Sequence, residues 1–317
     1  MTIRSLLFAV LCLAGSAFAQ YPSRPIHLIV PIPPGGAPDI AARVLGAKLS
    51  ERLGQPVVIE NKAGSNGNIA SEYVARSTPD GYTLALIADS QVVINPHLYR
   101  KMSFDPLRDL ALVSTVAANQ FVLAINPSLP PKTFPEFIDY ARKANPPLAY
   151  ASGGNGSQHH LTMEMLKRRA GIELVHVPYK GGSPATMATV SGETAAMWAG
   201  SSNAGQIKAG KLRPLAVSGA KRSAQYPELP TIGEFYPGFD NSIWLGIFGP
   251  AGLPGPVIER LRGEVKRALE SPDLKQKFNS SGGLEPYLLP AEGLTDLIRR
   301  DYEKYGKVVK EIGVKLD

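Results

Sequence analysis

Short apolar runs alternate with helical periods along most of the chain. The run Ile26–Val30 predicts a buried strand, and Asp39–Leu53 predicts a helix with one apolar stripe that Gly54 ends. Further strands are predicted at Val57–Glu60, Thr83–Ala88, Leu112–Ala117, Phe121–Ile125, Leu148–Ser152, Leu174–Pro178, Ala195–Ala199, Pro214–Ser218 and Ile243–Phe248. Further helices are predicted at Ile69–Ser77, Phe134–Ala144, Ser157–Ala170, Pro184–Ser191, Val257–Glu270 and Ala291–Ile312.

This alternation predicts an α/β protein whose sheets are mostly parallel and flanked by helices. A loop-rich stretch at Gly219–Asp240 has the features of a return crossing between domains, and a second crossing is expected near Ala118–Phe121. Two crossings divide the chain into a discontinuous domain 1, residues 20–119 and 238–317, and a domain 2, residues 120–237. A ligand cleft is then expected between two sheets, at the carboxyl ends of their strands.

The first 19 residues have the pattern of a cleaved export signal. One positive charge in Met1–Arg4 precedes the apolar run Leu6–Ala14, and Ala17–Ala19 fits the small-x-small cleavage rule. The run is too short to cross a hydrocarbon layer, which takes about 20 apolar residues. Cys12, the one cysteine of the sequence, lies in this segment. The mature chain therefore has no disulfide, thiol nucleophile or thiolate metal site.

Composition and charge narrow the classes of function. The chain of 317 residues is 44% hydrophobic and 19% charged, which excludes a disordered chain. The formal net charge is +7, but basic residues are scattered and the densest cluster, Lys167–Arg169, falls late in a predicted helix. This is no nucleic-acid footprint, and the charge supports only a mild attraction for anionic solutes.

Glycine-rich turns join several predicted strands to helices, at Ile32–Asp39, Gly64–Gly67, Ser152–Ser157 and Tyr179–Pro184. Glycine allows close approach of the backbone to a ligand, and each helix start offers unpaired N–H groups and a positive dipole end. Three charge-assisted hydrogen bonds and modest apolar packing reach roughly −8 kcal/mol, a micromolar affinity for a carboxylate. One such loop alone is an ordinary tight turn. Two of them, one in each domain, favour an anion site shared across the cleft, to which Gly64–Gly67 is not assigned.

Motifs for nucleotides, metals and catalysis are absent. Neither phosphate-binding glycine motif occurs, so no nucleotide cofactor is expected, and G-x-S-x-G and H-E-x-x-H are missing. The adjacent His159 and His160 point about 100° apart on a helix and cannot both ligate one metal comfortably. Ser157 and His160 leave two alternatives open. Either they form a nucleophile–base pair, or Ser157 caps the helix while His160 lines the cleft as a hydrogen-bond donor.

Three further residues have a structural and a functional interpretation. Asp39, at the start of the first helix, stabilises that helix end. Its functional role would be to fix the Gly35–Ala37 loop or to meet a donor on the ligand, and both roles can hold together. Lys180 either offers its charge to an anionic ligand or is simply solvated. Trp244, on a predicted strand, is more typical of a core position than of a cleft wall.

Taken together, the motifs resemble the substrate-binding receptors of tripartite tricarboxylate transporters (Bug-type receptors). The resemblance rests on Pro33–Asp39 with Ala42–Arg43, Asn95–Pro96 with Leu98–Tyr99, Asn155–Ser157 with His160–Leu161, His176–Gly181, Gly210–Arg213 with Leu215–Val217, Pro230–Thr231 with Glu234, and Trp244 with Gly246 and Pro250. These motifs follow one another over nearly all of the mature chain. Each is weak alone, and the set is specific.

The resemblance implies a two-domain periplasmic binding protein-like fold that closes on a small organic acid. It implies delivery to the membrane permease subunits of a tripartite transporter by a periplasmic monomer without a cofactor. Carried over residue by residue, the grip on one carboxylate falls on Pro33, Gly35, Gly36, Ala37, Asp39, Ser152, Gly156, Ser157 and His160. Our candidates for the other end of the ligand are Ser90, Gln91, Tyr179, Gly200 and Ser201. The run Gly192–Ala196 departs from the family by lacking an acid after Glu193, which puts in doubt a ligand amine that depends on it.

Two other functions are compatible with the sequence. The closed receptor would present its ligand to a membrane sensor such as a sensor kinase, or the chain would be an exported hydrolase that uses Ser157 and His160. Turnover of an ester or amide separates the hydrolase from a receptor, which binds its ligand without turnover.

Overall fold

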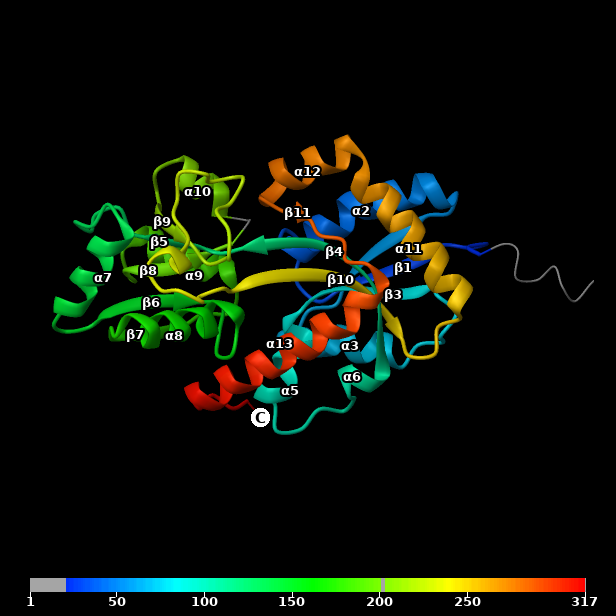
Figure 1. Ribbon diagram of the computed structural model, residues 1–317, viewed down its shortest axis with the longest axis horizontal. Coiled ribbons are helices and arrows are strands. Elements are labelled where there is room, and N and C mark those ends of the chain that lie inside the picture. The colour runs from blue at the N-terminus through cyan, green and yellow to red at the C-terminus, as the bar shows by residue number, and fades with distance from the viewer. Residues whose placement is uncertain (1–20, 201–202, 317) are drawn as a thin grey trace, which may run out of the picture.

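The computed structural model describes residues 21–200 and 203–316 (Figure 1). The expected export signal, residues 1–19, and the candidate Ser201 lie outside the described residues. Within the described part, none of the helices combines the length and the apolar character that a membrane crossing requires.

The first lobe is a six-stranded sheet with the helices around it. The strand order is β11-β4-β10-β3-β1-β2. Its strands are β1 (Ile26–Val30), β2 (Val57–Asn61), β3 (Thr83–Ala88), β4 (Leu110–Gln120), β10 (Ser242–Pro250) and β11 (Glu285–Pro286). Its helices are α2 (Ala37–Leu53), η1 (Ser65–Gly67), α3 (Asn68–Ala75), α4 (Ser90–Val93), α5 (Asn95–Leu98), α6 (Pro106–Asp109), α11 (Gly255–Glu270), α12 (Pro272–Gly282) and α13 (Ala291–Ile312).

The second lobe is a five-stranded sheet, ordered β7-β6-β8-β5-β9, with its own helices (left in Figure 1). Its strands are β5 (Val122–Ile125), β6 (Leu148–Ser152), β7 (Leu174–Pro178), β8 (Ala196–Ala199) and β9 (Arg213–Val217). Its helical segments are α7 (Phe134–Lys143), α8 (Gln158–Ala170), α9 (Gly182–Ser191), α10 (Ala204–Lys208) and η3 (Ile232–Glu234). The α/β class and the two helix-flanked sheets predicted from the sequence are confirmed.

Both sheets are mixed: most strands of each run in one direction, as expected, and a minority are opposed to them. β1 pairs in parallel with β2 and β3, and β6 pairs in parallel with β7 and β8. In contrast, β10 is antiparallel to β3 and β4, and β5 is antiparallel to β8 and β9. The reason is the crossing between lobes. β5 and β10 are the strands by which the chain enters each sheet, so they run away from the gap toward which β1, β3, β6 and β8 run.

Burial follows the hydrophobic pattern that predicted the elements. Leu84–Ile87 of β3 is at most 2% exposed because its sheet is covered on both faces. The stripe of α13 is buried through Leu297, Tyr305 and Val309. Trp244 lies in the core, where its Nε1 donates a 2.8 Å hydrogen bond to Asp301 Oδ2. The prediction of a core position for Trp244 is thereby confirmed.

Two connections carry the chain between the lobes, near the predicted crossings. β4 continues into β5 through Phe121, and residues 218–241 lead from β9 back to β10 (Figure 1). Ser218 ties the two connections together, since its Oγ accepts from the Phe121 backbone N (2.9 Å) and donates to the Asn241 carbonyl (2.9 Å). The crossing is therefore a small hydrogen-bonded unit rather than two independent linkers.

Candidate functional site

A cleft of about 470 Å³ opens where strands of both sheets end. Its walls are the segments that follow β1, β3, β6, β7 and β8, together with Phe121 and residues of β4 and β10. The lining residues are 31–38, Ala88, Ser90, Gln91, Asn119, Phe121, Gln158, His159, residues 180–184, Gly200, Asn203, Ile243 and Leu245. The carboxyl ends of parallel strands thus face one shared space, as the sequence predicted.

The loop between β1 and α2 presents backbone to the cleft. Gly35 has a φ of +98°, which favours glycine, and Gly36 is the N-cap of α2 without any side-chain cap. Asp39 lies behind the loop, where its Oδ2 accepts a 2.9 Å hydrogen bond from the Gly35 backbone N. Burial opposes ionisation of Asp39, but hydrogen bonds from Arg43, Asn61 and Gly35 outweigh it and lower its pKa. Asp39 therefore fixes the loop and does not itself line the cleft.

Four of the candidate residues lie in or beside the second glycine-rich loop, between β6 and α8. Ser152 Oγ pairs with His176 Nε2 at 2.6 Å, and the Gly156 backbone N donates to His160 Nδ1 at 3.1 Å. The His160 ring stacks on His176 with centroids 3.9 Å apart. Ser157 is the N-cap of α8, accepting from the His160 backbone N at 3.3 Å. None of the four candidates, Ser152, Gly156, Ser157 and His160, lines the cleft.

The first turn of α8 instead brings Gln158 and His159 to the cleft. The His159 ring lies on Phe121, with centroids 4.4 Å apart. Burial lowers the pKa of His159 to about 4, so its imidazole is neutral at physiological pH. The sequence analysis singled out the neighbouring His160, because helical spacing alone does not say which side of α8 faces the other lobe.

The loop between β7 and α9, also in the second lobe, forms another wall of the cleft. Gly181, with a φ of +110°, is the N-cap of α9 and has no side-chain cap. Lys180 is exposed and is the one charged side chain among the described residues that line the cleft. Tyr179 does not line it and donates its hydroxyl to Glu193 at 2.7 Å. This loop thus contributes backbone amides and one cation.

The remaining lining residues follow β3 and β8. Ser90 and Gln91 begin α4, and Gln91 Oε1 accepts from the Ala88 backbone N at 2.9 Å. Gly200 follows β8, where its N donates to Asn203 Oδ1 at 2.9 Å. Asn119 and Asn203 are cleft residues that the sequence analysis missed, since an isolated asparagine gives no signal of its neighbours in space.

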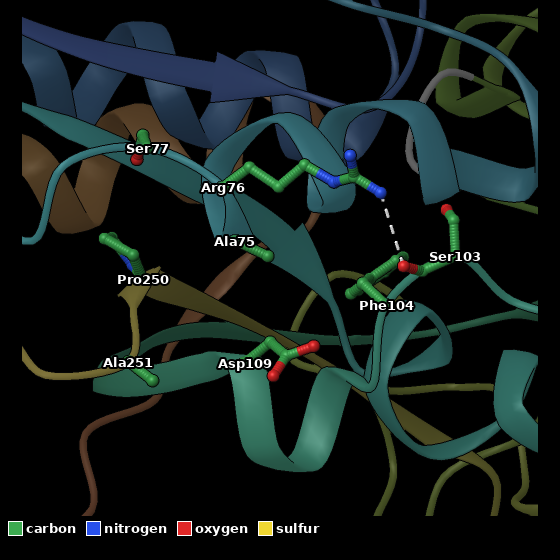
Figure 2. Close-up of a pocket in the computed structure, with 8 residues that line it drawn as sticks. All are labelled: Ala75, Arg76, Ser77, Ser103, Phe104, Asp109, Pro250 and Ala251. Atoms are coloured by element: carbon green, nitrogen blue, oxygen red, sulfur yellow. Dashed lines mark hydrogen bonds between the residues drawn. The ribbon is translucent and has the colours of Figure 1, made fainter.

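A second depression of about 460 Å³ lies on the first lobe (Figure 2). It is lined by residues that include Arg76, Ser103 and Asp109. Arg76 donates to the Ser103 carbonyl at 3.4 Å, the contact dashed in Figure 2. Asp109 accepts from Arg108 Nε at 2.8 Å and from the Asp105 backbone N at 2.8 Å. Its charged groups are therefore engaged within the protein, and the cleft between the lobes is the candidate site.

Known proteins resemble this chain over nearly its whole length. The family model described as tripartite tricarboxylate transporter family receptor matches residues 41–314. The protein BugT of Bordetella pertussis is 35% identical over 93% of this chain and 91% of its own length. Two solved structures are also similar. One is R. palustris Rpa4515 with adipate, with a TM-score of 0.86, 33% identity and coverage of 93% of this chain and 99% of that one.

The other is MatC from Rhodopseudomonas palustris with bound malate, with a TM-score of 0.79 and 28% identity over 91% of this chain and all of that one (100%). These relatives are solute-binding receptors, not enzymes, and the Ser157 hydroxyl of this chain is hydrogen-bonded to backbone rather than to an imidazole. The resemblance seen in the sequence is confirmed: this chain belongs to the tripartite tricarboxylate transporter receptor family.

Proposed function

We propose that the protein captures a small organic carboxylate by closing its two lobes and delivers it to the membrane subunits of a tripartite tricarboxylate-type transporter. The observation that carries the proposal is the convergence of two helix N-termini without side-chain caps, one from each lobe, on a single cleft. They belong to α2, at Gly36, and α9, at Gly181.

Electrostatics favours an anion at this position. The first backbone N–H groups of a helix have no partner within the helix and carry a partial positive charge. The neutral His159 and the cationic Lys180 add no negative charge, and no aspartate or glutamate is among the described lining residues. A carboxylate that bridges the lobes would thus replace water on both helix ends at once, which favours the closed arrangement.

The candidate residues divide into two groups in this proposal. Those that line the cleft would contact the ligand, namely Pro33, Gly35, Gly36, Ala37, Ser90, Gln91 and Gly200. Asp39, Ser152, Gly156, Ser157 and His160 would act from behind, by holding the two glycine-rich loops in shape. Tyr179 would support the third loop through its hydrogen bond to Glu193.

The proposal also covers the organisation of the chain. We assign residues 20–119 and 238–317 to domain 1 and residues 120–237 to domain 2, with the hinge at the Ser218 crossing. Cleavage after residue 19 would release a periplasmic monomer. The adipate and malate named for the two solved relatives support a small carboxylate as the ligand class.

A thermal-shift screen of mono-, di- and tricarboxylates on the mature chain tests the function. At a hundredfold excess over Kd, a ligand adds about 2.7 kcal/mol to the free energy of unfolding. Absence of a shift with every carboxylate contradicts the proposal.

A substitution in α9 locates the site. Gly182 lines the cleft, and a Cβ there meets no atom within 4 Å, so Gly182→Val should weaken binding without a clash in the fold. Loss of one charge-assisted hydrogen bond corresponds to about a tenfold rise in Kd. The matched control is Gly255→Val, at the first residue of α11, which is equally unobstructed and does not line the cleft. Equal Kd values for the two variants, measured by calorimetry, would remove α9 from the site.

A further inference from the structure

One hydrogen bond joins a cleft side chain of the second lobe to a buried acid of the first. Gln158 lines the cleft at the start of α8, and its Nε2 donates to Asp89 Oδ1 at 2.6 Å. Asp89 follows β3 and is 0% exposed.

The geometry determines which end of the Gln158 amide points away from the cleft. Asp89 Oδ1 also receives the Ser90 backbone N–H at 2.8 Å, and a backbone N–H can only donate. Oδ1 is therefore an acceptor, which requires the NH2 group of Gln158 on that side. The assignment holds for the protonated acid as well, because Oδ2 has no hydrogen-bond partner and is the oxygen left for a proton.

The carbonyl oxygen of the same amide, Oε1, is the atom left to accept a hydrogen bond from a ligand. Among the described residues, none is hydrogen-bonded to Gln158 Oε1, while Thr162 Oγ1 donates to the Gln158 backbone carbonyl at 2.6 Å and holds the helix turn. Gln158 thus offers the cleft a hydrogen-bond acceptor whose orientation Asp89 maintains.

A hydrogen-bond acceptor in the cleft pairs with a donor group on the ligand. The charges that line the cleft determine whether a charged or a neutral donor is favoured. An ammonium group would lose its hydration without an acidic lining residue to balance it, since Asp89 is fully buried behind the wall. A hydroxyl group donates one hydrogen bond and carries no charge.

We propose that Gln158 selects carboxylates that bear a neutral donor, such as a hydroxyl group, and that Asp89 is the positioning residue for its amide. The proposal rests on the proposed function and names the ligand class of that same site. It separates the two ligands named for the solved relatives, because malate has a hydroxyl group and adipate has none.

Calorimetry with pairs of acids that differ by one hydroxyl tests the proposal: malate against succinate, 2-hydroxyadipate against adipate, and 4-hydroxybenzoate against benzoate. One neutral hydrogen bond corresponds to about a fivefold preference for the hydroxylated member. Gln158→Met should bring the two Kd values of a pair together. Gln276→Met, the same change at an exposed position of α12, should keep the preference.

Two Asp89 variants separate positioning from a general structural role. Asp89→Asn keeps an acceptor oxygen and should retain the preference, whereas Asp89→Leu removes the acceptor and should abolish it, even where both variants unfold at a similar temperature. The proposal is overturned if the deoxy acid binds as tightly in every pair that binds, or if Gln158→Met leaves the ratio unchanged. Binding of no acid at all contradicts the proposed function too, and so is distinguishable from either result.

Discussion

At the scale of residues, two buried acids near the cleft have opposite titration behaviour. Asp39 has three hydrogen-bond donors around it, and its pKa is lowered. Burial raises the pKa of Asp89 to about 7, helped by the negative Asp301 and opposed by Gln158, Ser90 and Lys304. Burial is the largest influence on both acids, but at Asp39 a cation, Arg43, in direct contact helps to outweigh it, while the cation near Asp89 acts only from a distance.

The raised pKa of Asp89 predicts a pH-dependent cost to folding. The unfolded chain releases this proton near pH 4 and the folded chain near pH 7, so the folded state binds more protons in between and stability falls as pH rises through this window. Asp89→Asn should remove this pH dependence. Between pH 4 and 7, the free energy of unfolding of the variant should rise relative to that of the wild type, by on the order of a few kcal/mol at most. Above pH 7 the difference should be constant. Urea unfolding of both proteins from pH 4.5 to 8 measures it, and a pH-independent difference would contradict the assignment.

At the scale of elements, three of the helices that begin at the cleft, α2, α8 and α9, differ in their first turn. α8 is capped by the Ser157 hydroxyl, whereas α2 and α9 begin at glycines without a side-chain cap. A side-chain cap satisfies one of the free N–H groups at a helix end, and an uncapped end leaves that group for a ligand or water. We therefore expect Ser157 to cap α8 rather than to contact the ligand, although it lies beside cleft residues.

Ser157→Ala tests the capping role. Loss of an N-cap hydroxyl costs about 1 kcal/mol of unfolding free energy, and Ser157→Asp should restore most of it. Ligand affinity should change less than twofold in both variants, since the hydroxyl contacts the backbone of α8 and not the cleft. Urea unfolding and calorimetry measure the two quantities. A loss of binding without a loss of stability would make Ser157 a ligand contact.

At the scale of the whole molecule, the Ser218 unit connects the two lobes beside the cleft. Phe121 takes part in both, since its backbone is bonded to Ser218 and its side chain lines the cleft beside His159. Asn241, the other partner of Ser218, accepts from the Tyr305 hydroxyl of α13 at 2.7 Å. Through these bonds the position of the lobes and the shape of the cleft are linked.

Ser218→Ala should affect both stability and binding. It leaves the buried Phe121 N–H without its partner, at a cost of about 1–3 kcal/mol, and it loosens the crossing that aligns the two walls. Ser71→Ala, which removes another fully buried hydroxyl within the first lobe, should lower stability without changing Kd. Unfolding curves and calorimetry on both variants make the comparison. The same Kd for both would show that Ser218 stabilises the fold without setting the cleft.

Local patterns were sufficient for most elements because periodicity and glycine turns act within a few residues. The strands Ile26–Val30 and Leu174–Pro178 and the helix Ala291–Ile312 have the predicted bounds. The helix Pro272–Gly282 was missed, since its polar composition gives a weak period and only Leu274 and Phe278 are buried among residues 272–280.

The sequence alone therefore determined the α/β elements and the family, both of which depend on residue type and order along the chain. Only the tertiary structure decided that the sheets are mixed, that His159 rather than His160 reaches the cleft, and that Gln158 meets Asp89. These facts depend on how two sheets are placed relative to each other. One step along a helix turns a side chain by about 100°, and no short-range pattern specifies which direction faces the other lobe.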